Sequence, residues 1–477
     1  MTSFFADNAW LPHGWCTGVR FGVNPGGSFE QVKEDVQRGE AQYLGRYILP
    51  GMPNLHSHAF QRAMAGLAER RHSGSSQRNT EDSFWTWRET MYAFASRVGP
   101  DDLRAIAAQL YVEMLKAGYT HVCEFHYLHH RPDGKPYDDP AEMSLALVEA
   151  AQEAGIGLTL MPTLYMTGGF DGRPLSERQR RFGLDVDGYL LLLERLRKME
   201  NSTLRIGVAL HSLRAVPEAA MRAVLEHVSA PTRESAGSGA GQPALPVHIH
   251  VAEQIGEVQD CLALRNARPV EWLLDHAPVD ARWCLVHATH LSADETARLA
   301  ATGAVAGLCP TTEANLGDGL FPLKAYLDAG GVIGIGSDSH ISVSPVEELR
   351  WLEYGQRLVT RRRNIAASDS SDSVGETLWG DVLFGGAAAA GAAIGALEAG
   401  DDAAARADLL VLDEASALLA GRSTASALDT FLFAGNSNLV KHVMVDGAWV
   451  VRDFRHRDEE RIAARYRDTA TRLAESI

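Results

Sequence analysis

The sequence predicts an α/β protein: a TIM-like (β/α)8 barrel, with a small β-sandwich domain built from both ends of the chain. From about residue 46 to residue 344, short β-branched runs alternate with longer amphipathic stretches, and eight such runs occur. Strand–helix units repeated eight times are typical of a closed barrel of parallel strands. A doubly wound open sheet is the rival, but polar residues end nearly every run, as at the C-terminal face of a barrel. The eight runs are RYILPGMPNLHSH, THVCEFHY, GIGLTLMPTLYM, RIGVALHS, LPVHIHVAEQ, RWCLVHATH, AVAGLCPTTEANLG and GVIGIGSDSH.

The stretches between the runs have the pattern of helices. Residues 101–118 and 141–155 are both amphipathic, and the second ends in glycine, as helices often do. Outside the barrel, residues 1–45 and 405–452 are turn-rich and strand-like, with an Asp-Gly turn expected between short strands of the second segment. We therefore expect four parts: one end of the β domain (1–48), the barrel (49–398), the other end of the β domain (399–455) and a terminal helix (456–477).

Three segments are expected to be surface loops, because Ser, Gly, Asn and Asp cannot bury much apolar surface. They are residues 70–83, 231–244 and 363–375. The first follows the first barrel strand and should lie over the catalytic face. A passive loop is favoured there over a lid.

Charge and composition exclude several classes of partner. The chain has 45 basic and 61 acidic residues, a formal net charge of −16, which repels nucleic acid and anionic membranes. We therefore expect neither as a partner, and any anionic substrate must be held by local arginines. No apolar run reaches eighteen residues, so no membrane span is expected. Barrels with a terminal β domain often pair, so a homodimer is possible.

The sequence also favours a cytoplasmic location. The first residues, MTSFFADNAWLPHGW, lack a basic start followed by an apolar run, so no secretion signal is expected. The five cysteines form no CxxC pair and no paired framework, and three lie within apolar runs.

Histidines and one aspartate at the strand ends indicate a metal site. His56 and His58 are two apart on a strand, so both imidazoles point to the same side. That pair alone is weak evidence, but His250 and Asp338 end two further runs, and strand ends converge in a barrel. Imidazole nitrogen and carboxylate oxygen suit zinc, with a position left for water. His56, His58, His250 and Asp338 are therefore the predicted ligands.

Two alternatives stay open at this centre. His248 lies two residues before His250 on the same face, and we prefer His250 because it places Glu253 close to the metal. His287, which ends the sixth run, is a further candidate ligand. We expect instead that His287 hydrogen-bonds the attacking oxygen, that Asp338 accepts a proton from water and that Glu253 shuttles protons to nitrogen. The alternative for Glu253 is a solvated or salt-bridged carboxylate.

At this point the sequence resembles the amidohydrolase superfamily in its mononuclear deaminase branch. The resemblance implies one Zn²⁺ per chain, because two-metal members need a bridging group, often a lysine on strand four, and RIGVALHSLRAV has none. A closer likeness to members that act on linear amidines implies that N-formimidoyl-L-glutamate is hydrolysed to N-formyl-L-glutamate and ammonia in histidine degradation. The motifs are LPGMPNLHSHAFQRAMAG, FWTWRETMY, EFHYLHH, ALHSLRAVP, HIHVAEQ, LCPTTEANLGDG and GSDSHISVSPVEELR.

A substrate with two carboxylates needs local positive charge. Arginine forks bind carboxylates bidentately, and we expect Arg214 and Arg88 to hold them. Gln61, Tyr127 and His211 are the candidate hydrogen-bond partners on the same face. Surface ion pairs are the alternative role for each arginine.

Two rival functions are weighed against this one. The first is deamination of a neutral heterocycle, such as guanine, cytosine or an adenosine derivative, which would not need two arginines. The second is a non-catalytic assembly protein on the same barrel. It is disfavoured because such proteins typically lack metal ligands, whereas all four are present here together with Glu253.

Overall fold

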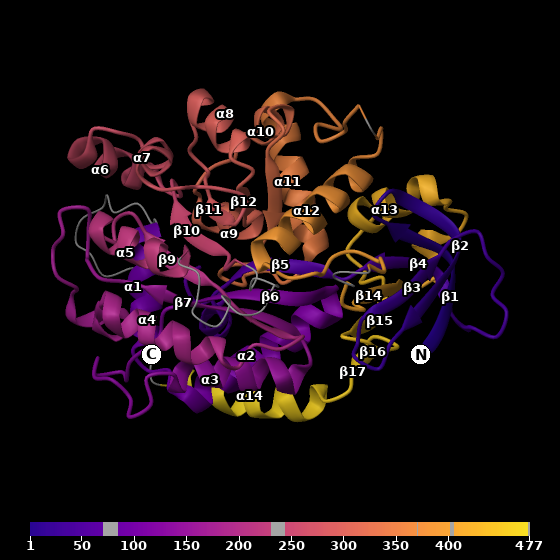
Figure 1. The fold of residues 1–477 in the computed structure, drawn as a ribbon, viewed down its shortest axis with the longest axis horizontal. Helices are drawn as coiled ribbons and strands as arrows, with labels where there is room; N and C mark the ends of the chain where they lie inside the picture. The colour runs from indigo at the N-terminus through magenta and orange to yellow at the C-terminus, as the bar shows by residue number, and fades with distance from the viewer. Residues whose placement is uncertain (70–83, 230–243, 370, 401–404, 476–477) are drawn as a thin grey trace, which may run out of the picture.

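The computed structural model describes residues 1–69, 84–229, 244–369, 371–400 and 405–475, and its strands form two sheets (Figure 1). The larger sheet is a barrel of eight parallel strands in the order β5-β6-β7-β9-β10-β11-β12-β13, and the short β8 pairs with β7. The predicted barrel is therefore confirmed. Its strands are β5 (Met52–Ser57), β6 (Tyr119–His126), β7 (Gly157–Leu164), β8 (Leu204–Ile206), β9 (Val208–Ser212), β10 (Val247–Val251), β11 (Trp283–His287), β12 (Val305–Leu308) and β13 (Val332–Ile335).

The barrel closes between its first and last strands, at the level of the predicted site. Ser57 at the end of β5 forms a parallel bridge with Asp338, three residues after β13. Two backbone hydrogen bonds make this seam: His58 N–H donates to Asp338 O (3.1 Å), and Asp338 N–H donates to His56 O (3.0 Å). Three of the four predicted metal ligands therefore lie on the closing ladder.

Helices cover the outside of the barrel (Figure 1). Residues 101–118 and 141–155 form α2 and α3 as predicted, and each helix ends at a glycine in the left-handed conformation, Gly118 (φ 108°) and Gly155 (φ 79°). The α-helices are α1 (Phe84–Ala95), α2 (Pro100–Ala117), α3 (Glu142–Ala154), α4 (Val186–Arg197), α5 (Glu218–Ser229), α6 (Ile255–Arg265), α7 (Pro269–His276), α8 (Ala293–Ala301), α9 (Pro310–Leu316), α10 (Leu323–Asp328), α11 (Pro345–Thr360), α12 (Val374–Ala390), α13 (Thr424–Phe433) and α14 (Glu459–Ala474). The 3-10 helices in the described part of the chain are η1 (Ala59–Met64), η2 (Glu177–Phe182) and η3 (Ala417–Leu419).

The second sheet combines both ends of the chain, as the sequence predicts. Its order is β17-β16-β15-β14-β4-β1-β2-β3, with β4 parallel to β1 and antiparallel to β14. Apolar side chains from both ends, among them Phe21, Leu409 and Met444, share one buried cluster. The strands are β1 (Thr2–Leu11), β2 (Gly14–Val23), β3 (Phe29–Lys33), β4 (Gln42–Pro50), β14 (Leu409–Leu412), β15 (Val440–Val445), β16 (Ala448–Arg452) and β17 (Arg455–His456).

The first run of the sequence is divided between the two sheets. Residues 46–50 belong to β4, and the barrel strand β5 begins only at Met52. Gly51 lies between them, where a Cβ would come 2.2 Å from Thr120 Oγ1, so only glycine lets the two sheets approach so closely here.

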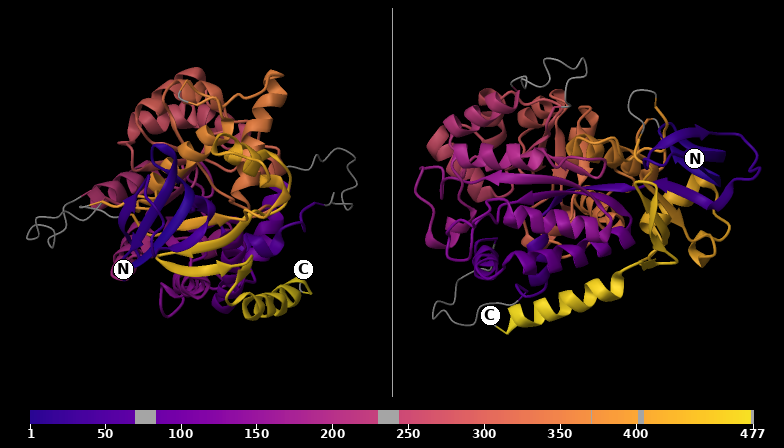
Figure 2. Two further views of the ribbon diagram at one scale, coloured as in Figure 1. Left: turned by 90° about the vertical axis from the view of Figure 1, so that its right-hand side faces the viewer. Right: turned by 60° about the horizontal axis from the view of Figure 1, so that its bottom comes forward.

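The buried Arg406 links the two sheets, and the terminal helix packs against the barrel. Arg406 Nε donates to Asp408 (2.9 Å), and its Nη2 donates to Thr120 O at the start of β6 (3.4 Å). α14 packs along α2 (Figure 2), where Lys116 Nζ donates to Glu459 (2.7 Å).

The structure describes only some of the predicted loops. The 70–83 loop lies outside the described residues, as does the 231–244 loop except for its last residue. The 363–375 segment is largely irregular, as predicted, although its end begins α12 at Val374, capped by Ser373. The boundaries at residues 48, 398 and 455 stay a prediction. No helix of the described residues is long and apolar enough to span a membrane.

Candidate active site

Three buried imidazoles meet at the C-terminal end of the barrel. His56 and His58 come from the end of β5, and His250 comes from β10. Their Nε2 atoms lie 3.2 Å apart (His56–His58), 3.3 Å apart (His58–His250) and 3.0 Å apart (His250–His56). Asp338 Oδ1 lies 3.5 Å from His56 Nε2 and 3.4 Å from His58 Nε2.

The surroundings of two of these rings fix which nitrogen carries the proton. His58 Nδ1 donates to Phe125 O (2.8 Å), and His250 Nδ1 donates to His211 O (2.9 Å). Burial lowers the pKa of His56, His58 and His250, which favours the neutral form of the rings. With Nδ1 protonated, the Nε2 lone pairs of His58 and His250 face each other, as they would around a shared cation. Backbone carbonyls that accept from Nδ1 are the usual support of ligating histidines.

The separations between these atoms fit a small divalent ion. Zinc–nitrogen bonds of about 2.0–2.1 Å in a tetrahedron place ligand atoms about 3.3 Å apart. Five of the six separations among these ligand atoms run from 3.0 to 3.5 Å, and the sixth, between His250 and Asp338, is longer than 4.0 Å. His248, the alternative to His250, instead donates from Nε2 to Ala389 O (2.9 Å). These four side chains can therefore hold one zinc ion.

Backbone strain is concentrated beside this centre. Asp338 (φ 45°), His287 (φ 69°) and Ala288 (φ 47°) adopt the left-handed conformation although each carries a Cβ. Such residues cost about 1–3 kcal/mol each and persist where the surrounding structure demands them. Here they lie at the end of β11 and three residues after β13, beside the cluster of imidazoles.

His287, at the end of β11, lies among carboxylates. Its Nε2 is 3.8 Å from Glu253 Oε1 and 3.8 Å from Asp338 Oδ2, and its Nδ1 is 3.3 Å from Glu313 Oε1. Although burial opposes the charged form, these carboxylates raise the pKa of His287 to about 10. Burial raises the pKa of Glu253 above its usual range. The pair can therefore hold and exchange protons near neutral pH.

One pocket brings the predicted residues together. Of the predicted site residues, all but His56 line it, and His56 touches His58 and His250 beneath it. Gln61 comes from η1, Arg88 from α1, Tyr127 from the loop after β6, His211 from β9 and Arg214 from the loop after β9. Gln61 Nε2 donates to Tyr127 Oη (3.0 Å).

The two arginines differ in their surroundings. Arg214 is partly buried, and although burial opposes its charge, the carboxylate of Glu257 raises its pKa. Within the described ranges, no carboxylate forms an ion pair with the Arg214 guanidinium. Burial lowers the pKa of Arg88, whose guanidinium lies 5.5 Å from the centre of the Tyr92 ring.

Sequence reasoning missed several residues of the site. Tyr92, Tyr165 and Phe182 form an aromatic wall of the pocket, and the Tyr165 ring lies 4.3 Å from the His211 ring. The buried Glu124 of β6 accepts from Ala59 N–H (2.6 Å) and from the Ser57 hydroxyl, so it fixes the loop that follows the HxH pair. Glu124 follows Cys123 in THVCEFHY, and no local pattern distinguishes it from an ordinary strand residue.

A second carboxylate that sequence reasoning missed contacts the backbone of Glu253. Glu257, on the first turn of α6, is buried and accepts the backbone N–H of Glu253 (3.2 Å). It therefore holds the turn that carries Glu253 and faces the charge of Arg214. Its position four residues after Glu253 was the only available signal.

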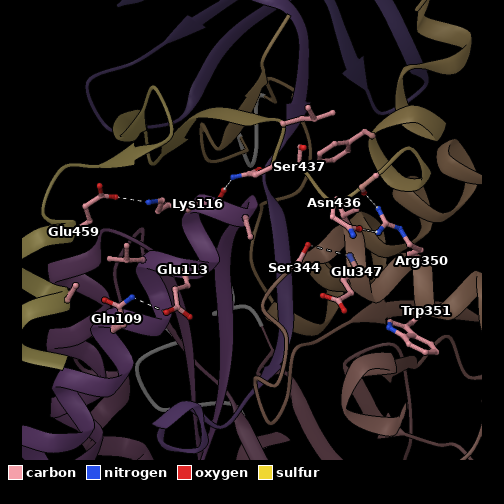
Figure 3. A pocket seen from close by; sticks show the side chains of 18 of the residues that line it. Gln109, Glu113, Lys116, Ser344, Glu347, Arg350, Trp351, Asn436, Ser437 and Glu459 are labelled. Atoms are coloured by element: carbon pink, nitrogen blue, oxygen red, sulfur yellow. Dashed lines mark hydrogen bonds and ion pairs between the residues drawn. The ribbon is translucent and has the colours of Figure 1, made fainter. Parts of the chain in front are cut away.

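A far larger cavity, of about 1260 Å³, lies away from this centre (Figure 3). It is lined by parts of α2, α11 and α14 and by the segment before β15. Two of its basic side chains already have partners: Lys116 pairs with Glu459, and Arg350 donates to Asn436 Oδ1 (2.7 Å). None of the predicted site residues lines it, so chemistry rather than size identifies the candidate active site.

The fold and this centre define a metal-dependent hydrolase built on a (β/α)8 barrel, and the chain belongs to the amidohydrolase family, which residues 47–450 match. Members of this family depend on metal. The chain is 52% identical to the formimidoylglutamate deiminase of Pseudomonas aeruginosa over 97% of each chain. It is also 26% identical to the 5-methylthioadenosine/S-adenosylhomocysteine deaminase of Natronomonas pharaonis, over 86% of this chain and 82% of that protein.

Solved structures share the whole architecture. An amidohydrolase from Brucella melitensis is 43% identical, with a TM-score of 0.89 over 99% of this chain and 100% of that one. An adenosine deaminase from Xanthomonas campestris, solved with bound zinc, is 18% identical, with a TM-score of 0.76 over 99% of this chain and 98% of that one. The latter likeness shows the fold alone.

Proposed function

We propose that the protein hydrolyses N-formimidoyl-L-glutamate to N-formyl-L-glutamate and ammonia, a step of histidine degradation. One observation supports this above the others: a single pocket holds a histidine–aspartate metal centre, a proton-exchanging Glu253–His287 pair and two arginines. The similarity to the Pseudomonas aeruginosa formimidoylglutamate deiminase, over nearly the full length of both chains, points to the same substrate.

His56, His58, His250 and Asp338 are the proposed ligands of one Zn²⁺ per chain. A bound divalent cation supplies a water molecule of lowered pKa at neutral pH. The Nε2 atoms and the Asp338 carboxylate provide the donor set, and the separations of 3.0–3.3 Å among the three Nε2 atoms leave room for a single ion. Asp338 also reaches His287 through its second oxygen, so one carboxylate connects the metal centre to the proton-exchanging pair.

The proton steps follow from the positions of three side chains. Water oxygen attacks the formimidoyl carbon, the bond from that carbon to the terminal nitrogen breaks, and both water hydrogens end on ammonia. Asp338 accepts the first proton, and Glu253 delivers protons to the nitrogen, so that ammonia rather than an anion leaves. His287 donates from Nε2 to the attacking oxygen and steadies the tetrahedral carbon.

Arg214 and Arg88 are proposed to bind the two carboxylates of the substrate. Arg214 keeps its charge beside the buried Glu257, and a carboxylate is the partner that its fork-shaped guanidinium favours. Gln61, Tyr127 and His211 are proposed to hydrogen-bond the substrate, because their polar atoms face the same pocket. The net charge of −16 makes such local positive charge necessary.

The direct test is ammonia release from N-formimidoyl-L-glutamate by the zinc-loaded protein, with and without a chelator. Guanine and S-adenosylhomocysteine serve as comparison substrates because they carry the neutral heterocycles of the rival function. Faster turnover of either would refute the proposal. Metal analysis separates catalysis from an assembly role: one zinc per chain together with ammonia release is expected.

Two expectations about the whole protein stay predictions. A homodimer is supported by the large apolar side chains of Trp351 and Leu358, which are 44% and 74% exposed on α11, and light scattering would measure it. A cytoplasmic location would be measured by cell fractionation.

A further inference from the structure

Glu313 is a buried carboxylate beside His287 that the proposed mechanism does not yet use. It lies on the first turn of α9, directly after β12, and is 5% exposed. α9 contributes Leu316 to the lining of the pocket, whereas Glu313 is not among the residues that line it. Glu313 therefore acts on the chemistry through another side chain, His287.

One oxygen of Glu313 accepts two hydrogen bonds. Oε1 accepts the Cys309 backbone N–H (2.9 Å) and lies 3.3 Å from His287 Nδ1. The backbone contact anchors the carboxylate to the start of its own helix, so the oxygen has a fixed place from which to accept Nδ1–H. A histidine whose Nδ1 is bound in this way presents Nε2 on its other side. Here Nε2 faces Glu253 and Asp338.

We propose that Glu313 is a positioning residue for the deiminase reaction: it holds the His287 ring with Nδ1 protonated and Nε2 directed at the reacting oxygen. This inference rests on the proposed function.

The alternative is that Glu313 only anchors α9, and the structure offers a control for it. A second buried carboxylate, Glu348 of α11, holds the same helix by accepting Thr311 N–H (2.9 Å) and Thr311 Oγ1–H (2.6 Å). Thr312 Oγ1 also lies 3.0 Å from Ser339 Oγ. α9 is therefore anchored independently of Glu313, whereas within the described chain only Glu313 contacts His287 Nδ1.

The kinetic test compares alanine substitutions at the two glutamates in the zinc-loaded full-length enzyme. We expect Glu313→Ala to lower kcat about 10- to 100-fold, the usual effect of removing a residue that orients an active-site histidine, with KM changed less than about twofold. Glu348→Ala should lower the melting temperature but leave kcat within about threefold. Glu313→Gln should recover most of the loss, because an amide oxygen still accepts both hydrogen bonds.

A spectroscopic readout tests the same inference without turnover. In protein labelled with 15N-histidine, the Nδ1–H signal of His287, assigned with a His287→Gln variant, should be present in wild type and in Glu348→Ala. It should be lost or exchange rapidly with solvent in Glu313→Ala. If the wild-type enzyme releases no ammonia from the substrate, the proposed function fails, but this signal still tests the role of Glu313.

Two results would overturn the positioning role. One is a Glu348→Ala variant whose kcat falls as far as that of Glu313→Ala, since that would make anchoring of α9 the common cause. The other is an unchanged His287 Nδ1–H signal in Glu313→Ala.

Discussion

Replacing Arg214 by alanine tests the substrate end of the site most directly. A hydrogen bond to a charged group contributes about 1.5–3 kcal/mol, and about 1.4 kcal/mol corresponds to tenfold in an equilibrium constant. Loss of one such contact should therefore raise KM by about 10- to 100-fold. Because carboxylate contacts bind the ground state and the transition state alike, kcat should change little.

Removing Arg214 also affects Glu257, and this second effect must be separated from the loss of substrate binding. Glu257 is buried, faces the Arg214 charge and holds the backbone of Glu253, so losing the arginine leaves a buried carboxylate without its counter-charge. The double variant Arg214→Ala/Glu257→Gln removes that charge as well. We expect it to recover thermal stability but not KM.

The assay is ammonia release measured against substrate concentration, repeated with formamidine, which has the reacting group but no carboxylate. Arg214→Ala should bind formimidoylglutamate weakly yet turn over formamidine as wild type does. Arg222→Ala, at an exposed arginine paired with Glu218, is the matched control. An equal loss with both substrates, or an unchanged KM for formimidoylglutamate, would refute the carboxylate role of Arg214.

The remaining predictions concern metal, pH and stability. A chelator should abolish ammonia release and lower the melting temperature, and added zinc should restore both, because an ion that binds only the folded state stabilises it. A metal-free protein that still released ammonia would contradict the metal centre. Burial raises the pKa of the Asp381 carboxyl from 3.8 to about 6, so the folded protein binds this proton more tightly than the unfolded chain does. The ionised carboxylate therefore destabilises the folded protein. This destabilisation is absent below about pH 4 and complete above about pH 6. Allowing for its partial exposure, Asp381→Asn should stabilise the protein by about 1–2 kcal/mol at pH 8 and not at pH 4, and equal melting temperatures at pH 8 would contradict this. Asp408→Ala should destabilise by about 3–5 kcal/mol in urea unfolding because it leaves Arg406 buried without its partner, and a loss below about 1 kcal/mol would show that other contacts hold Arg406.

The sequence could predict the barrel and the composition of the pocket for a geometric reason. Side chains two apart on a strand share a face, and parallel strand ends meet at one side of a barrel. That was enough to select His56, His58, His250 and Asp338. In the structure the three imidazole Nε2 atoms lie within 3.3 Å of one another, and Asp338 Oδ1 lies within 3.5 Å of His56 and His58.

The supporting carboxylates could not be predicted in the same way. Glu124 and Glu257 act through contacts that depend on how helices and loops pack behind the strand ends. A buried glutamate has no periodic signature that distinguishes it from a solvated one. The division of the first run at Gly51 was also missed, because the close approach of Gly51 to Thr120 depends on how the two sheets pack and leaves no mark on the local sequence.

The closing seam of the barrel has a consequence for how the protein matures during its synthesis. Its two edges, near Ser57 and Asp338, are separated by most of the polypeptide, so a ribosome has made more than two thirds of the chain before they can meet. Until then, His56 and His58 have no Asp338 beside them. Acquisition of the ion should therefore be a late event of maturation, and truncated translation products that stop before β13 should be unable to retain it.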